Sequence, residues 1–229
     1  MSVYAGPEII NDGLVLCLDA GNIKSYPGSG TTWTDSSGMN VNGTLTNGPT
    51  YNASNGGSLV FDGVDDITTF SKSWNDMKGN SWGGFLTIEG VFKTTSVPTN
   101  SAMGYFGFNS AGAYFKFMNT GNLFVDSGST VPSRIITNCI TTFSNYYGTW
   151  VHVVGVYDGT VKTYYNGVLM NTSSPFTLAD ISSLNFSVGD GMGYYNFQGN
   201  ISNVKVYNRA LSANEIRQNF NAIRGRFGI

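Results

Sequence analysis

Few side chains in this sequence carry the charge that acid–base chemistry needs. The 229 residues include three glutamates, Glu8, Glu89 and Glu215, in three separate segments. Cleavage of a glycan requires two carboxyl groups about 5 to 9 Å apart across the scissile bond. Glu89 lies in the middle of the segment LTIEGVF, but no acidic residue stands two positions to either side of it. The sequence therefore predicts no catalytic residue and a protein that is not an enzyme.

Three aspartates lie close together in the segment FDGVDD, at the end of a predicted strand: Asp62, Asp65 and Asp66. Calcium takes several oxygen ligands, commonly carboxylates together with backbone carbonyls of tight turns. This cluster is a candidate metal site, with Ca²⁺ as the candidate cofactor. The alternative, a solvated group of aspartates that caps the turn, stays open. The pairs Asp19 with Asn22 and Asp35 with Ser36 are weaker candidates.

Five aromatic residues stand in polar, loop-like segments: Trp33, Trp74, Trp82, Tyr194 and Tyr195. Sugar binding uses aromatic faces beside amides and acids, and such groups are nearby. Tyrosine and tryptophan are also enriched in protein–protein interfaces. For each residue alone, packing in the core is the alternative, but together the five predict a binding surface whose ligand is undefined.

We expect the other strands of the fold to be arranged around the segment 149–172, TWVHVVGVYDGTVKTYYNGVLMNT. Asp158-Gly159 and Asn166-Gly167 are typical of two-residue type I′ turns, so the segment is predicted to be a three-stranded antiparallel meander. In its first strand, apolar residues occupy both faces, which indicates a strand covered on both sides. We expect one cover to be the second sheet of a sandwich and the other to be a concave binding surface.

Other apolar runs predict further strands around a long polar loop over residues 21–57. The composition agrees with an all-β fold, because 11% of residues are charged and 30 are glycines. The predicted strands cover residues 13–20, 43–45, 58–62, 67–70, 85–94, 105–108, 114–118, 122–125, 134–137, 184–188 and 201–207, with a loop over 71–84.

Composition also excludes several classes of partner. The net charge is −2 and the basic residues are scattered, so no nucleic-acid-binding surface is expected. No apolar run reaches the length of a membrane span, and the N-terminus lacks the features of a signal peptide. Cys17 and Cys139 are far apart, and two buried free thiols are the favoured interpretation.

A short helix is predicted at the C-terminal end of the sequence, over residues of about 213–224. Ser212 and Glu215 have the spacing of a capping box, and Gly225 should end the helix. Ile216, Phe220 and Ile223 form one apolar stripe that must be buried, since so short a helix is marginal alone. Arg217, Arg224 and Arg226 should then project outward. Arg224 and Arg226 are candidate contacts to an acidic partner surface, and a solvated basic end is the alternative.

The segments LVLCLDAGN, SYPGSGTTWTDSSG, GGSLVFDGVDD, TWVHVVGVYDG and GNISNVKVYNRALSANEIRQNF together resemble the concanavalin A-like, laminin-G-like jelly-roll domains of bacteria and phages. The resemblance spans nearly the whole chain and implies one domain over residues 1–229. It implies two antiparallel sheets of six or seven strands in a jelly-roll sandwich, with calcium sites in some relatives and sugar binding in some. The histidine position of His152 is a packing position in that family.

The resemblance also implies a context. Members with this opening and an ending like RGRFGI look like proteins encoded among the virion genes of marine tailed phages. The first hypothesis is therefore an accessory structural protein of the phage particle, such as a capsid decoration or knob, made in the host cytoplasm. Its partners would be other virion proteins of the capsid or tail, and host-surface glycans. A carbohydrate-binding adhesin or receptor-binding module is the alternative, and a glycan hydrolase or lyase is a remote one.

Overall fold

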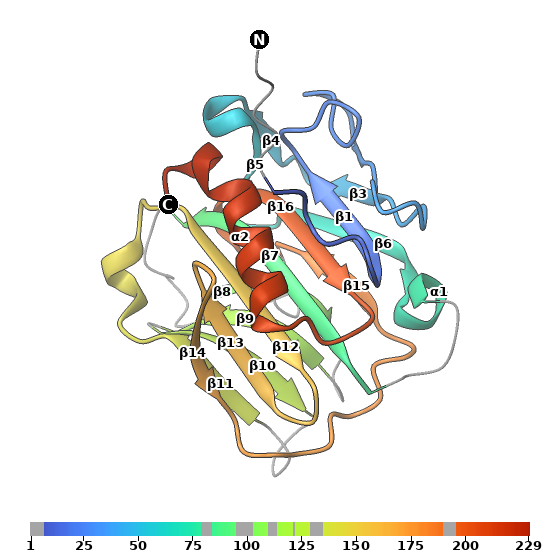
Figure 1. The fold of residues 1–229 in the computed structure, drawn as a ribbon. Helices are drawn as coiled ribbons and strands as arrows, with labels where there is room; N and C mark the ends of the chain where they lie inside the picture. The colour runs from blue at the N-terminus through green and yellow to red at the C-terminus, as the bar shows by residue number, and fades with distance from the viewer. Residues whose placement is uncertain are drawn as a thin grey trace.

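The computed structural model of the chain describes residues 7–78, 84–94, 103–109, 114–120, 122–128, 135–189 and 196–229. Its strands form two antiparallel sheets that pack face to face, and one long helix crosses the outer face of one sheet (Figure 1). This is the predicted all-β sandwich with a C-terminal helix. Among the described residues, no helix is long and apolar enough to span a membrane.

Sheet A contains the meander and the strand that carries Glu89. Its order is β14 (Val168–Thr172), β13 (Val161–Tyr165), β12 (Val151–Tyr157), β7 (Leu86–Thr94), β16 (Gln198–Tyr207), β5 (Ser58–Asp62) and β4 (Thr50–Asn52). The long strand β16 pairs with β5 at its beginning and with β1 (Leu14–Asp19) at its end. Residues from the first and last parts of the chain are therefore neighbours on this sheet.

Sheet B is the second layer. Its order is β11 (Ile135–Ile140), β10 (Leu123–Gly128), β9 (Tyr114–Asn119), β8 (Met103–Asn109), β15 (Asn185–Val188), β6 (Ile67–Ser73), β3 (Gly43–Thr46) and β2 (Thr32–Trp33). Each sheet thus has eight strands in the described part of the chain, more than the six or seven implied by the resemblance. Residues 74–78, predicted as loop, form the short helix α1 (Trp74–Lys78).

The meander β12–β13–β14 is confirmed, but its two turns differ. Asn166 and Gly167 both have positive φ, 46° and 77°, and form the predicted two-residue turn. The first turn has three residues, because Tyr157 pairs with Val161, and Asp158 does not have positive φ. The Asp158 carboxylate accepts a hydrogen bond from the Thr160 hydroxyl at 2.8 Å. The local side-chain contact therefore stabilises a longer turn than the Asp-Gly pair predicts.

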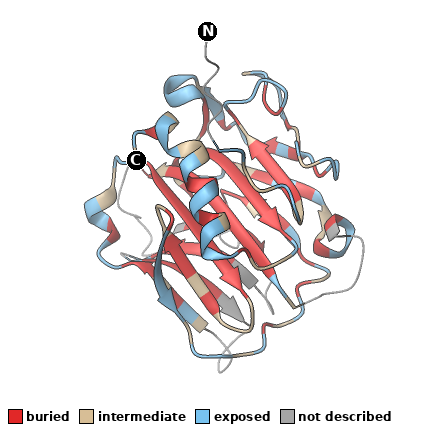
Figure 2. Ribbon diagram, viewed as in Figure 1, coloured by how far each residue is buried: buried red, intermediate tan, exposed pale blue. Residues whose placement is uncertain are grey.

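The main core lies between the sheets and is rich in aromatic side chains. The strands of the two sheets are mostly buried (Figure 2). Val151 and Val153 of β12 point into it, as the alternation of that strand predicts. At its centre the rings of Phe92 and Tyr105 are 4.3 Å apart between centroids. Both cysteines are free and buried, in agreement with the sequence interpretation.

The helix α2 (Ala213–Phe227) packs on the opposite face of sheet A, where the sequence predicts a concave surface. The predicted capping box of Ser212 and Glu215 is present. The helix continues three residues beyond 224, and Gly228, with φ of 69°, ends it in place of Gly225. A tertiary contact explains the longer helix, because the centroid of the Phe227 ring lies 4.9 Å from that of the Trp150 ring.

The polar segment 21–57 contains three short strands and ordered loops. Asp35 organises it: its carboxylate accepts hydrogen bonds from the backbone N–H groups of Cys17, Ser37 and Val41. Because both of its oxygens are used in this way, Asp35 is a structural carboxylate of the loop. The same loop brings Asn22 and Ser36 beside the end of β1.

Candidate functional site

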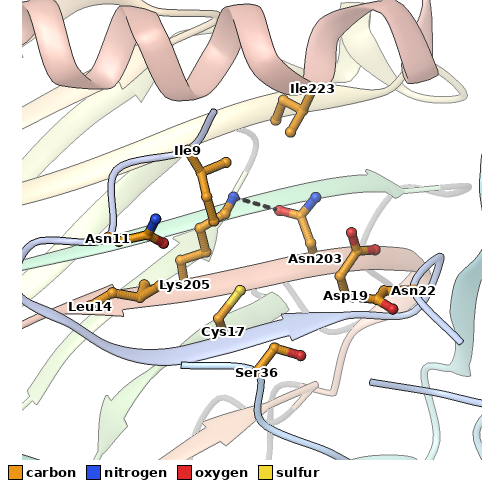
Figure 3. A pocket seen from close by; sticks show the side chains of 10 residues that line it. All are labelled: Ile9, Asn11, Leu14, Cys17, Asp19, Asn22, Ser36, Asn203, Lys205 and Ile223. Atoms are coloured by element: carbon orange, nitrogen blue, oxygen red, sulfur yellow. Dashed lines mark hydrogen bonds between the residues drawn. The ribbon is translucent and has the colours of Figure 1, made fainter. Parts of the chain in front are cut away.

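A pocket of about 210 Å³ lies on the outer face of sheet A, between α2, the segment before β1, and the paired strands β1 and β16. Figure 3 shows Ile223 reaching toward it from α2, with side chains of β1 and β16 on the opposite side. The apolar part of its lining is contributed by Ile9, Leu14, Cys17 and Ile223. Its polar part is contributed by Asn11, Asp19, Asn22, Ser36, Asn203 and Lys205.

Strand pairing determines which residues form the floor of this pocket. Cys17 lies opposite Lys205, and Asp19 lies opposite Asn203. Asn203 and Lys205 are only 2% and 3% exposed, whereas Asn11 and Asn22 on the rim are exposed. The pocket therefore has a buried polar floor and an accessible polar rim.

Both charged groups of the pocket are neutralised by partners outside it. The Lys205 ammonium lies 2.8 Å from Glu89 Oε1, and the Asp19 carboxylate lies 2.7 Å from Arg226 Nη1. Burial by itself lowers the pKa of Lys205, but the nearby Glu89 raises it above its ordinary value. The lysine therefore stays charged and paired, and the pocket offers no uncompensated charge.

Glu89 belongs to a buried polar network beside the pocket. Its Oε1 accepts from Lys205, and its Oε2 accepts from the amide of Asn219 on α2 at 2.7 Å. The same amide donates to the Tyr207 hydroxyl at 2.9 Å. Burial alone would raise the pKa of Glu89, but Lys205 and the hydrogen bonds hold it below its ordinary value. Glu89 is fully buried and ionised, so it cannot reach a substrate and is not a general acid.

His152 packs next to this network, as the resemblance implies. It is fully buried, and its ring lies 5.5 Å from the ring of Phe220. Its Nε2 is 3.3 Å from Glu89 Oε1, but the alignment is too poor for a hydrogen bond. The remaining glutamates are elsewhere, with Glu8 exposed and Glu215 held by the capping box and Arg209. In the described part of the chain, no second carboxylate stands across a groove from Glu89.

The predicted aromatic surface needs correction. Trp33 and Trp74 are both 0% exposed and belong to the core between the sheets, so they cannot contact a ligand at the surface. Trp74 packs at 5.1 Å against the ring of Phe108, which explains why a tryptophan with polar neighbours in sequence is buried. Trp82, Tyr194 and Tyr195 lie outside the described residues.

The structure brings Asp62, Asp65 and Asp66 together, with carboxylate oxygens all within 4.8 Å of one another. Two of the three are exposed, and among the described residues no lysine or arginine forms an ion pair with them. Burial and the two neighbouring carboxylates raise the pKa of Asp66. Asp62 and Asp66 also accept backbone hydrogen bonds within the turn, from Val64 and Asp62 respectively. The donor set fits a calcium ion, and it also acts as a turn cap.

The two predicted partner-binding arginines differ sharply. Arg224 is exposed, with its guanidinium 5.8 Å from the ring of Phe220. Arg226 does not project outward, which corrects the prediction. Its guanidinium pairs with Asp19, and it donates to the carbonyls of Asn55 and Gly57 and to the Ser202 hydroxyl. Arg226 therefore holds the end of α2 against sheet A.

Two packed sheets, a helix across one face and a polar pocket beside that helix define a lectin-like β-sandwich. The chain belongs to the concanavalin A-like lectin/glucanases superfamily, whose laminin G-like model matches residues 62–217. This confirms the resemblance seen in the sequence. A comparison with curated proteins found no match.

Two of the solved structures to which the chain is similar are binding domains of toxins. The chain is similar to the binding domain of botulinum neurotoxin DC, solved with rat synaptotagmin II, with 16% identity and a TM-score of 0.73. The match covers 93% of this chain and 52% of that one. The chain is also similar to the binding domain of Paraclostridial Mosquitocidal Protein 1, with 19% identity, a TM-score of 0.70, and coverage of 93% and 52%. The chain thus spans about half the length of these toxin domains.

A third similar structure matches over nearly its whole length. It is domain 4 of AbnA, an extracellular arabinanase from Geobacillus stearothermophilus, in complex with arabinotriose. The identity is 19% and the TM-score 0.68, with 91% of this chain and 98% of that domain covered. At such identities the likeness establishes the fold alone.

Proposed function

We propose that this protein is a non-enzymatic, lectin-like domain that binds glycans. The observation that carries the proposal is the contrast on the outer face of sheet A. Glu89, the one mid-strand glutamate, is buried and paired with Lys205 under α2, whereas the adjacent pocket presents neutral polar groups to solvent. Such a face can hold a polar ligand but has no accessible acid–base pair with which to cleave it.

The comparisons support binding as the function. A domain of the same fold was solved with arabinotriose, and the toxin structures of this fold are binding domains. Glycans are the ligand class we propose here, because amide and hydroxyl groups in a small pocket suit sugar hydroxyls, which both donate and accept hydrogen bonds.

A glycan array followed by titration calorimetry tests this proposal. We expect binding to a subset of neutral glycans, and no release of reducing ends from β-glucans, alginate or agarose. The absence of any glycan ligand across the array would refute the proposal. Reducing-end release that disappears in the Glu89→Gln variant would show instead that the protein is a hydrolase.

We further propose that the protein is an accessory component of a tailed-phage particle, with capsid or tail proteins and host-surface glycans as partners. The support is the likeness of its opening and ending to proteins encoded among phage virion genes. Quantitative mass spectrometry of purified particles tests this. Many copies per particle indicate a capsid decoration, few copies indicate a receptor-binding tip, and absence from the particle refutes a virion role.

We also propose that Asp62, Asp65 and Asp66 bind one calcium ion. Three neighbouring carboxylates without a cationic partner repel one another, and a bound cation would remove that repulsion. Chelation should then lower the melting temperature, because an ion bound only by the folded state stabilises it by mass action. The Asp65→Asn variant should melt lower and be insensitive to the chelator. If chelation leaves the wild-type melting temperature unchanged, the cluster is a turn cap only.

A further inference from the structure

The floor of the pocket under α2 contains an amide whose donor has no hydrogen-bond partner among the described residues. Asn203 is 2% exposed, and the one hydrogen bond of its side chain is the contact of Oδ1 with Lys205 Nζ at 3.3 Å. Its Nδ2 makes no hydrogen bond with the described residues. This donor is not one of the fully enclosed polar atoms that lack a partner, so it is open to the pocket, where a ligand or ordered water can accept its hydrogen bond. The side chain is visible in Figure 3 beside that of Lys205.

Further unpaired polar groups surround this donor. The side-chain amide of Asn11 and the hydroxyl of Ser36 make no hydrogen bond to other described residues. The Asn22 Oδ1 accepts a hydrogen bond from the backbone N–H of Lys24 at 3.0 Å, and its Nδ2 makes no hydrogen bond to the described residues. Donors and acceptors are therefore mixed on the rim, whereas an ion site would present groups of one kind.

The charges around the pocket argue against an ionic ligand. Lys205 is paired with Glu89, and Asp19 with Arg226, at distances of 2.8 and 2.7 Å. An anion at Lys205 would compete with a buried ion pair, and a cation at Asp19 would compete with Arg226. Separating either pair would leave a charge without its partner, which is costly. The apolar side chains of Ile9, Leu14 and Ile223 add surface for the C–H face of a ring.

We propose that this pocket binds one neutral cyclic polyol, such as a single uncharged sugar residue, with Asn203 as the donor at its floor. The volume of about 210 Å³ suits one ring and not an extended chain. The choice of a sugar among polyols rests on the proposed function, whereas the pocket, its neutrality and the role of Asn203 rest on the geometry alone.

The test measures binding of defined probes by saturation-transfer NMR and titration calorimetry. The neutral probes are D-galactose, D-glucose, L-arabinose and myo-inositol, and the charged ones are D-galacturonic acid and D-galactosamine. We expect at least one neutral probe to bind, with the corresponding charged probes at least tenfold weaker. Asn203→Leu should weaken binding at least tenfold, and Asn11→Ala, on the exposed rim, several-fold.

A matched control is Asn185→Leu on β15, an exposed asparagine of sheet B, which should leave binding unchanged. Because Asn203→Leu removes a buried amide, its fold is verified by its melting temperature and circular dichroism, and the rim variant tests the pocket without that risk. Glycan binding that is equally strong in both pocket variants would refute the pocket and leave the proposed function standing. Binding of myo-inositol without any glycan ligand would refute the proposed function and support the pocket. Failure of all neutral probes would refute the pocket.

Discussion

The outer face of sheet A has two polar regions under the same helix, and they differ in whether protein groups fill them. Under the middle of α2, Glu89 accepts hydrogen bonds from Asn219 and Lys205, and Asn219 Oδ1 accepts one from the backbone N–H of Ile10 at 2.8 Å. Beside it, under Ile223, the pocket contains Asn203 with an unpaired donor. The first region is filled by protein groups, and the second is not.

This difference shows what buried polarity does in each place. A fully bonded set of buried charges specifies how α2 lies on the sheet, but its removal as a set need not cost stability. The Asn203 amide donor, in contrast, makes no hydrogen bond with the described residues and so adds no such bond to the fold. The network therefore belongs to the helix–sheet contact, and the pocket is the place where we propose that a ligand binds.

The largest loss of unfolding free energy is expected for the variant Lys205→Met, which tests the network. This variant leaves the Glu89 carboxylate buried beside Asn219 but without its cation, and removal of one partner of a buried pair typically costs about 4 kcal/mol. Denaturation in urea should show this loss of unfolding free energy. The double variant with Glu89→Gln should recover most of it, because no charge then remains buried. A single variant as stable as the wild type would mean that the pair is not buried in solution.

The apolar contact beside the network predicts the next effect. Phe220 is 8% exposed, and its ring lies over His152 and the Asn166–Gly167 turn. Phe220→Ala should lower the free energy of unfolding by roughly 3 kcal/mol through lost burial and a cavity. Phe85→Ala, at a phenylalanine that is 49% exposed, is the control and should change stability little. Equal effects of the two variants would show that α2 does not pack on the sheet.

At the pocket end of α2, Arg226 and Arg224 provide a matched pair. Arg226 bonds to Asp19, to two carbonyls and to the Ser202 hydroxyl, so Arg226→Ala should cost about 2 kcal/mol. Arg224→Ala should stay within about 0.5 kcal/mol, because Arg224 is exposed. Thermal melts of the two variants measure the difference. If Arg224→Ala were the more damaging, the assignment of Arg226 as the anchor of the helix end would be wrong.

Local sequence signals predicted the parts of this face that depend on neighbours in sequence. The Ser212–Glu215 spacing predicted the cap, and the alternation in β12 predicted which side chains enter the core. The prediction that Trp33 and Trp74 lie on a binding surface was wrong. Their neighbours in sequence are polar, but the residues that contact them across the sandwich are apolar and distant in sequence. The end of α2 was likewise decided by a distant contact, that of Phe227 with Trp150.

The pocket could not be predicted because its residues are far apart in sequence. Asn11 and Asp19 meet Asn203 and Lys205 only through the pairing of β1 with β16. One signal was present: the strand ISNVKVY places Asn203 and Lys205 at alternate positions among apolar residues. A lysine and a glutamate that both lie mid-strand are expected to be partners, and that expectation would have indicated the Glu89–Lys205 pair.

The smallest effect is expected at the N-terminus of α2, away from both polar regions, and it depends on pH. Two hydrogen bonds from Arg209, with further bonds from Ser212, lower the pKa of Glu215 from near 4.5 to about 2. For a carboxyl group whose pKa is lowered by folding, the stabilisation is complete above the ordinary pKa and is lost as the pH falls through the folded value. Glu215→Gln should therefore cost about 1 kcal/mol at neutral pH. The difference between variant and wild type should shrink as the pH falls from about 5 to 2. A difference that is independent of pH would mean that the charge of Glu215 does not contribute to the cap.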